Sequence, residues 1–317
     1  MSAFLAERMW PGAQVERSIF GTGDPEAIWQ QVLAICPEAV DCFMFEVSVG
    51  ALLGLVLADG ERVALKVHVD RAVGGYLEAM QAVQEQLWRR DFPCPRPLGV
   101  RGRATLEEWR DEGGYLDAHD SAVRRALADL LATLVGLGRD LEPSPKLVPF
   151  LRTSGGRLWP KPHNVLFDFE ATADRAGWID EIATAARSRR DAGQGDLVIG
   201  HHDWTVKHVR FDGLRPTVVY DWDSLSADLE PCFAGDAAAT FTYTNHLPVE
   251  LWPTVDEAEA FIDDYERARG RPFTPRERGT ARAAAVYTRA YSTRCIHAVG
   301  GDARSLRLEE HARELLD

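Results

Sequence analysis

The residues best suited to chemistry lie in one polar stretch, residues 199–213, which reads IGHHDWTVKHVRFDG. Asp203 is a candidate general base that can accept the proton of an attacking hydroxyl group, and His201 can brace the same loop. His208 follows five residues after Asp203, and Asp221 follows after eighteen, in VVYDWDSL. A carboxylate at the end of a strand can bind a hard cation such as Mg²⁺. We therefore expect a base beside a metal site.

A lysine in an apolar stretch upstream is a second candidate. Lys66 lies in RVALKVH, where alternation places it on the same strand face as Ala64. On an edge strand such a lysine would face solvent; in a site, its ammonium would bind phosphate as a point charge. A phosphate-binding lysine needs a carboxylate to hold it. Glu78, twelve residues on, is the preferred partner, and Glu85 is the alternative.

The first part of the chain is expected to be rich in strands. Residues 42–70 contain apolar runs separated by Asp59-Gly60, a strong hairpin signal. Residues 76–90 have the apolar spacing of a helix. After them, a turn at Arg101-Gly102 predicts a second hairpin. This part therefore predicts a small antiparallel sheet with one main helix.

The second part is expected to be mostly helical. Residues 120–138 predict an amphipathic helix, and residues 230–317 are largely helical in pattern. Two short strands flank Gly213, beside the polar stretch. The order predicts an α+β protein with an N-terminal lobe, residues 1–110, and a C-terminal lobe, residues 111–317. A cleft between unlike lobes suits a nucleotide.

These motifs together resemble one family. Lys66, Glu78, HHDWTVKH and VVYDWDSL look like the aminoglycoside phosphotransferase and choline kinase-like family, whose pattern is H-x-D-x-x-x-x-N followed, after a hairpin, by D-x-D or D-x-E. The resemblance covers roughly residues 25–300 and is strongest over 199–225. It implies a bilobal protein-kinase-like fold and ATP-dependent, Mg²⁺-assisted phosphorylation of a hydroxyl on a small molecule.

The resemblance also implies roles for individual residues. Lys66 would bind phosphates, Glu78 would hold Lys66, Asp203 would be the catalytic base, and Asp221 would bind Mg²⁺. The implied adenine-binding hinge is the segment that contains Glu107, Glu108 and Trp109 and ends at Arg110.

The sequence departs from the family pattern at His208, where the family has Asn. Imidazole is a poorer ligand for Mg²⁺ but a reasonable one for Mn²⁺. His208 could ligate a second metal, or hold the loop in a one-metal site, or mark a site that has lost turnover. The chain also lacks G-x-G-x-x-G between its first strands, since SVGALLG has its glycines at another spacing.

A second segment imitates the family loop. Residues 162–170 read PHNVLFDFE, but five residues before Asn164 the chain has Trp159 where the pattern needs Asp. We interpret this segment as a structural or substrate-side loop.

Net charge and composition limit the classes of binding partner that the protein is expected to have. A net charge of −13 over 317 residues argues against nucleic-acid binding and against an anionic membrane surface. No apolar run approaches the ~18 residues of a membrane helix. The five cysteines are scattered without a CxxC pair, which favours reduced thiols and a cytoplasmic protein.

The acceptor is predicted from an acidic segment. Between Asp221 and Asp264 the chain has eleven carboxylates and no Lys or Arg. If this segment lines the acceptor pocket, it would attract a cationic molecule such as an aminoglycoside or an amino alcohol; a solvated acidic helix is the alternative. A metabolic kinase for choline-, homoserine- or sugar-like acceptors and a nucleotide-binding regulatory protein without turnover stay open.

Overall fold

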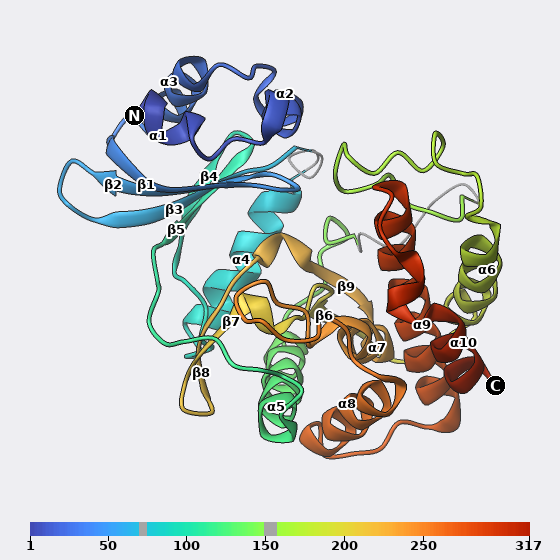
Figure 1. Cartoon of the computed structure of the whole chain (residues 1–317). Helices are drawn as coiled ribbons and strands as arrows, with labels where there is room; N and C mark the ends of the chain where they lie inside the picture. The colour runs from blue at the N-terminus through green and yellow to red at the C-terminus, as the bar shows by residue number, and fades with distance from the viewer. Residues whose placement is uncertain (70–74, 149–156) are drawn as a thin grey trace.

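A five-stranded antiparallel sheet forms the N-terminal part of the molecule (Figure 1). The computed structural model describes residues 1–69, 75–148 and 157–317. The sheet has the order β1-β2-β3-β5-β4. Its strands are β1 (Ala39–Val47), β2 (Ala51–Leu57), β3 (Arg62–Val67), β4 (Pro97–Arg101) and β5 (Ala104–Glu108). Helices α1 (Ser2–Ala6), α2 (Gln14–Phe20) and α3 (Pro25–Ile35) cover one side, and α4 (Tyr76–Trp88) lies on the other.

The turns of this sheet fall where the sequence predicts them. Gly60 and Gly102 have φ values of 89° and 62°, a region that favours glycine, and each closes a two-strand hairpin. Gly50 has a different reason to be glycine, because a Cβ there would lie 2.3 Å from the Val67 carbonyl oxygen. The glycine between β1 and β2 thus allows close contact with β3.

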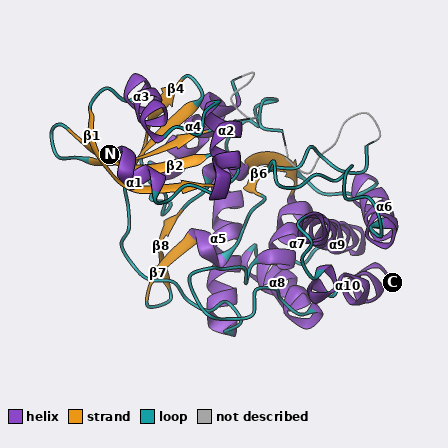
Figure 2. Cartoon of the chain, turned by 45° about the horizontal axis from the view of Figure 1, so that its top comes forward, coloured by secondary structure: helices purple, strands orange, loops and turns teal. Residues whose placement is uncertain are grey.

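Helices dominate the C-terminal part (Figure 2). They are α5 (Ser121–Gly138), α6 (Gly177–Asp191), α7 (Glu230–Thr240), α8 (Val255–Ala268), α9 (Pro275–Ala298) and α10 (Leu308–Leu316). Two small antiparallel pairs stand beside them: β6 (Leu197–His201) with β9 (Leu225–Leu229), and β7 (Val209–Asp212) with β8 (Arg215–Val219). The mixed architecture, a sheet with one main helix followed by a helical part, confirms the predicted fold class.

Buried apolar residues form two clusters. One lies among α1–α3 and the sheet, from Leu5 to Leu106. The other begins at Tyr76 and includes α4 together with the helices of the C-terminal part. The Tyr76 hydroxyl donates to the carbonyl oxygens of Asp223 (2.6 Å) and Leu225 (2.7 Å). The helix α4 is thus anchored to the C-terminal part, and the lobe boundary at residue 110 stays a prediction.

Two further expectations concern the state of the cysteines and the presence of a membrane-spanning helix. All five cysteines are free and buried. Within residues 1–69, 75–148 and 157–317, no helix combines the length and the apolar character that a membrane crossing requires.

Candidate active site

Two strand pairs bring the predicted site residues together. The strands β6 and β9 are antiparallel with His201 opposite Leu225, so the loop after β6 and the segment before β9 lie side by side. Backbone hydrogen bonds from His202 N–H to Ser224 O (3.1 Å) and from Tyr220 N–H to His208 O (2.9 Å) fix their relative position. This pairing explains how residues eighteen positions apart meet in space.

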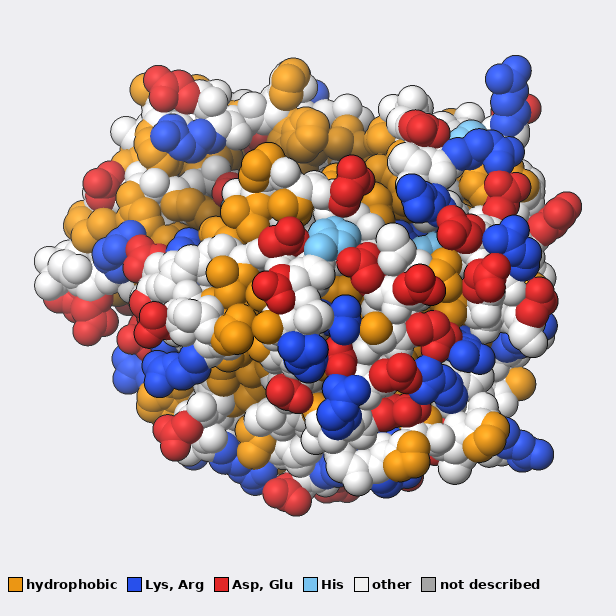
Figure 3. Space-filling model, turned by 60° about the horizontal axis from the view of Figure 1, so that its bottom comes forward, with side chains coloured by type: hydrophobic (Ala, Val, Ile, Leu, Met, Phe, Trp, Pro, Cys, Tyr) orange, Lys and Arg blue, Asp and Glu red, His pale blue; other side chains and the backbone are white. Residues whose placement is uncertain are grey.

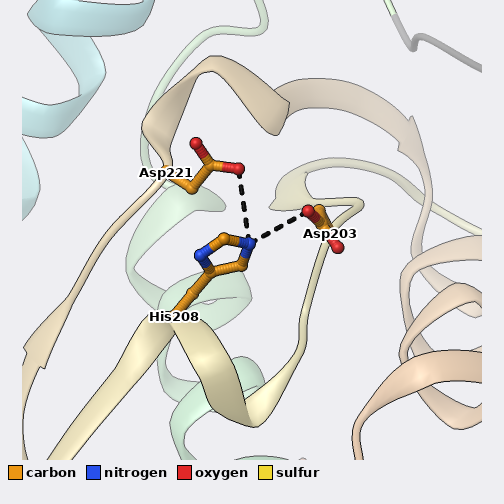
Figure 4. A group of neighbouring side chains, drawn as sticks. All are labelled: Asp203, His208 and Asp221. Atoms are coloured by element: carbon orange, nitrogen blue, oxygen red, sulfur yellow. Dashed lines mark hydrogen bonds and ion pairs between the residues drawn. The ribbon is translucent and has the colours of Figure 1, made fainter. Parts of the chain in front are cut away.

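The imidazole of His208 lies between two carboxylates (Figure 4). Its Nε2 is 3.0 Å from Asp203 Oδ2 and 3.4 Å from Asp221 Oδ2. Among the described residues, one group of three potential metal-ligating side chains has its ligand atoms within 4.8 Å of one another, and it consists of these three. Asp221 has a left-handed backbone, with φ of 66°. Such a conformation is uncommon for a non-glycine residue and concentrates at functional sites.

Lys66 connects the sheet to this group. It forms ion pairs with Asp221 and, at 2.9 Å, with Asp223 Oδ1. His68, two residues further along the chain, has Nδ1 3.3 Å from Asp223 Oδ2. The strand β3 thus places a lysine from the N-terminal part on both carboxylates of the D-x-D motif.

The ionisation of these groups follows from their neighbours. Burial alone would raise the pKa of Asp203, but the charges of Lys207 and His208 lower it below its ordinary value. Burial alone would also raise the pKa of Asp221, but the charge of Lys66 holds that pKa well below the usual range. Burial would lower the pKa of Lys66, yet Asp221 and Asp223 raise it. At neutral pH the carboxylates are ionised and the lysine is charged.

His201 joins the segment that contains Asp203 to the segment that contains Asp221. It is fully buried, and its Nε2 donates to the Asp221 carbonyl oxygen at 2.9 Å. Burial lowers its pKa to about 4, so the imidazole is neutral at physiological pH. This contact joins the loop of Asp203 to the backbone of Asp221, in keeping with the predicted bracing role of His201.

The three ligand side chains fit a divalent cation. Two carboxylates supply the hard oxygens that Mg²⁺ and Mn²⁺ bind, and imidazole is acceptable to Mn²⁺. In the present geometry His208 Nε2 is within hydrogen-bonding distance of Asp203. A hydrogen on that nitrogen would hold the loop, whereas a metal would require its lone pair, so both predicted roles of His208 are compatible with the geometry.

The residues predicted to form the adenine-binding hinge differ in their surroundings. Trp109 packs edge-on against Phe43 with ring centres 4.7 Å apart. Gly54 lies opposite Ala64, and a Cβ at Gly54 would meet the Phe43 ring at 2.5 Å. Phe43 and Trp109 therefore cover the sheet face that also carries Ala64 and Lys66.

The two hinge glutamates are unlike each other. Glu108 is exposed. Glu107 is on the opposite face of β5, where burial raises its pKa to about 7, partly offset by a hydrogen bond from Gln84 and the charge of Lys66. Glu107 thus belongs to the same face of the sheet as Lys66.

The predicted ion pair between Lys66 and Glu78 is absent among the described residues. Glu78 is exposed in the first turn of α4, because the helix turns Tyr76, Leu77 and Met80 inward. The alternative partner, Glu85, pairs with Arg89 at 2.7 Å. Lys66 is held instead by the D-x-D carboxylates.

That the acidic segment after Asp221 lines an acceptor pocket stays a prediction. Several of its carboxylates are paired with arginines that lie outside the segment, whereas Glu250 and Asp256 are exposed. The pairs are Asp228 and Asp236 with Arg190, Glu230 with Arg139 and Arg269, Glu259 with Arg278 and Arg282, and Asp264 with Arg124 and Arg267. On the face shown in Figure 3, acidic and basic side chains are interspersed rather than gathered in one patch. The sequence did not reveal these ion pairs, because their partners are separated along the chain.

Three residues at the site were not selected from the sequence. Asp223 binds Lys66, although the D-x-D spacing already pointed to it. Lys207 has Nζ 3.9 Å from Asp203 Oδ2 and 5.1 Å from the centre of the Tyr243 ring. His163, in the segment that imitates the family loop, interacts electrostatically with Asp203 and Lys207. Both of the last two lie within segments that the sequence singled out, but the motif pattern gave neither of them a role.

The fold is that of protein-kinase-like small-molecule kinases. An amicoumacin kinase solved with AMP-PNP, Ca²⁺ and Ami matches with a TM-score of 0.64 at 11% identity, covering 93% of each chain. A choline/ethanolamine kinase family protein from Mesorhizobium loti has a TM-score of 0.55 at 14% identity, covering 92% of this chain and 98% of its own. A macrolide 2'-phosphotransferase type I has a TM-score of 0.51 at 16% identity, covering 92% and 97%.

These similarities confirm, at the level of the fold, the resemblance inferred from the motifs. No protein-family model matches the chain, and no curated protein matches it in sequence.

Proposed function

We propose that this protein is an ATP-dependent phosphotransferase that moves the γ-phosphate to a hydroxyl of a small molecule. The observation that carries the proposal is the convergence of Asp203, His208, Asp221 and Lys66 at one point between the two parts of the chain. A base, a cation site and a phosphate-binding ammonium are the parts that phosphoryl transfer requires.

Asp203 is the proposed base. Its lowered pKa keeps it ionised at neutral pH, and its carboxylate is 39% exposed, so an acceptor hydroxyl can reach it. Lys207 and His208 stabilise that ionised form. A positioned base of this kind contributes a factor of ~10²–10⁴ in rate.

Asp221 and His208 are the proposed ligands of Mg²⁺ or Mn²⁺, with Asp203 near enough to complete the group. The cation would neutralise charge on the nucleotide phosphates. Lys66 would then exchange its carboxylate partners for phosphate oxygens, which a flexible ammonium can do. Glu107 and Trp109 would border the adenine. Glu107 lies near the end of β5 on the sheet face of Lys66, and Trp109 directly follows β5.

The acceptor is proposed from the neighbours and from charge. The solved neighbours include an antibiotic kinase and a choline/ethanolamine kinase family protein, which supports a small hydroxyl compound. For a cationic acceptor, predicted from the acidic segment, fewer carboxylates would be free to bind it than the sequence suggests, because several of them are paired with arginines. Asp203 itself is the carboxylate best placed to attract an ammonium beside the reacting hydroxyl.

The test is a phosphoryl-transfer screen over cationic antibiotics, other hydroxyl-bearing antibiotics, amino alcohols and sugars, with Mg²⁺ and with Mn²⁺. We expect one class to be phosphorylated, and Asp203→Asn to lower kcat by ~10²–10⁴ while nucleotide affinity is kept. The matched control is Asp212→Asn, an exposed carboxylate on β7.

The competing function is nucleotide binding without turnover, as in a regulatory protein. It is favoured by His208 at the family's Asn position and by the partners that Lys66 already has. Nucleotide binding with no phosphorylated product from any class would support it against the phosphotransferase.

A further inference from the structure

A second ammonium group, besides that of Lys66, lies at the proposed site. Lys66 is paired with Asp221 from the side of the sheet. Lys207 has Nζ 3.9 Å from Asp203 Oδ2, in the carboxylate of the proposed base. Each of the two carboxylates at the candidate metal site therefore has a lysine of its own.

The backbone of Lys207 is held by the chain that follows α7. Its N–H donates to the Tyr243 carbonyl oxygen at 3.2 Å, and the N–H of the preceding Val206 donates to the Phe241 carbonyl oxygen at 2.9 Å. Tyr243 in turn packs against Trp252, with ring centres 5.2 Å apart. The side chain of Lys207 thus extends from a defined position beside the base.

The contacts of the Lys207 ammonium leave it able to bind an anion. Its Nζ lies 5.1 Å from the centre of the Tyr243 ring, within the range of a cation–π contact. The 3.9 Å contact with Asp203 is an ion pair but is longer than a hydrogen bond, whereas His208 Nε2 approaches the same oxygen to 3.0 Å (Figure 4). The Lys207 side chain is also 27% exposed. The ammonium can therefore donate to an incoming anion without giving up a hydrogen bond to Asp203.

Phosphoryl transfer brings such an anion to this point. The acceptor oxygen forms a bond to the γ-phosphorus, the bond from that phosphorus to the β,γ-bridging oxygen breaks with its electron pair leaving on ADP, and the hydroxyl proton passes to Asp203. A base that contacts the attacking hydroxyl is therefore close to the transferring group as well. Lys207, 3.9 Å from that base, can reach the phosphoryl oxygens on its flexible stem.

The change in charge during transfer favours this exchange. Before transfer, Lys207 faces an ionised Asp203. Once Asp203 has taken the proton, its carboxyl is neutral and no longer attracts the ammonium, while negative charge is spread over the phosphoryl oxygens. An interaction that strengthens in the transition state raises kcat rather than the affinity for the acceptor.

We propose that Lys207 is a further catalytic residue, which binds the γ-phosphoryl group while it is transferred. The inference rests on the proposed phosphotransferase function and adds a residue to its site. Lys66 binds the nucleotide phosphates from β3, and Lys207 binds the transferring group from the side of the base.

The experiment measures binding of the terminal phosphate separately from turnover. AMP-PNP, which carries a γ-phosphate, and ADP, which lacks one, are titrated calorimetrically into the full chain with saturating Mg²⁺ and then with saturating Mn²⁺. Lys207→Met and Lys207→Gln remove the charge at two different polarities, and Lys207→Arg keeps it. The matched control is Arg215→Met, which removes a positive charge from the exposed first residue of β8.

We expect the two neutral variants to weaken AMP-PNP binding about three- to tenfold and to leave the Kd of ADP unchanged. With an acceptor found in the screen, kcat should fall roughly 10²-fold, while KM for that acceptor changes by less than about twofold. Lys207→Arg should recover most of the affinity for AMP-PNP, and Arg215→Met should behave as the parent.

The outcomes separate the two proposals. Equal weakening of AMP-PNP and ADP, or an unchanged Kd of AMP-PNP, would overturn the assignment of Lys207. A raised KM for the acceptor with unchanged kcat would also overturn it, because Lys207 would then bind the acceptor. A selective loss of AMP-PNP affinity, in a protein that phosphorylates no acceptor, would keep the assignment and count against the phosphotransferase. Failure of the parent to bind either nucleotide would overturn both.

Discussion

Two pairs of carboxylates lie only a few residues apart in the sequence but in different surroundings. Asp221 and Asp223 are paired with Lys66, and 24% and 11% of their side chains remain exposed. Asp228 and Asp236 are paired with Arg190, at 8% and 0% exposure. The first pair lies at the junction of the two parts of the molecule, and the second lies in the interior of one part.

The two pairs of carboxylates differ in the type of cation that they face as much as in their burial. Arginine has a fixed planar fork of donors and stays charged, so it suits a permanent buried pair. Lysine presents a point charge on a flexible stem, and histidine can exchange a hydrogen for a metal. These differences predict a permanent internal ion pair in one place and an exchangeable site in the other.

The largest effect on stability is expected at the arginine-paired group. Asp236→Asn would remove a charge that faces Arg190 at 3.6 Å and also binds His202 Nδ1 and the Thr288 hydroxyl. Leaving a buried cation short of a partner costs about 3 kcal/mol. Denaturant unfolding should therefore give a loss of ~2–4 kcal/mol, with the activity per folded molecule unchanged.

Asp203→Asn should behave in the opposite way, losing turnover with a change of under ~1 kcal/mol in the free energy of unfolding, because its carboxylate is 39% exposed. Asp212→Asn should change neither quantity. Equal losses of stability in Asp203→Asn and Asp236→Asn would contradict the distinction between exchangeable and permanent pairs.

The sequence predicted the local parts of this arrangement well. The hairpin at Asp59-Gly60 and the helix predicted over residues 76–90 depend on neighbouring residues, and both are present in the structure. The loop with Asp203 and the strand-end Asp221 follow a spacing that a short hairpin dictates. These features can be read from the sequence because their physical causes lie within a few residues.

The partners of the acidic segment could not be predicted in the same way. Arg139 pairs with Glu230 from ninety-one residues away, and Arg190 reaches Asp228 across thirty-eight. Counting charges along the segment therefore could not separate the carboxylates that tertiary pairing buries, such as Asp228 and Asp236, from those that stay exposed, such as Asp256. The environment of His163 could not be predicted for the same reason, since its partner Tyr291 lies 128 residues away along the chain.

Glu107 is a carboxylate in a third kind of environment, because the groups that offset its burial are Gln84 and Lys66 rather than an arginine. Burial raises its pKa to about 7, whereas an unfolded chain leaves it near 4.5. The folded state therefore binds the proton more tightly, so the contribution to stability is fully present below about pH 4.5 and declines as pH rises to about 7. Glu107→Gln should stabilise the protein by roughly 1–3 kcal/mol at pH 8 and by much less at pH 5.5.

Thermal or denaturant unfolding at the two pH values measures this difference. The matched control is Glu108→Gln, the exposed neighbour on β5, which should change stability by less than ~0.5 kcal/mol at either pH. A pH-independent effect of Glu107→Gln would mean that Glu107 is ionised in the fold, with Lys66 or Gln84 compensating its burial.

The smallest effect, and the sharpest test of exchangeability, concerns the metal. His208→Asn replaces a nitrogen ligand by an amide oxygen, which suits Mg²⁺ better. If His208 exchanges its contact with Asp203 for a cation, the ratio of kcat with Mn²⁺ to kcat with Mg²⁺ should fall roughly three- to tenfold, about 1 kcal/mol. His297→Asn, at the end of α9, should leave the ratio unchanged. An unchanged ratio in His208→Asn would assign the imidazole to holding the loop, and the 3.0 Å contact with Asp203 would then be permanent, like the arginine pairs of the interior.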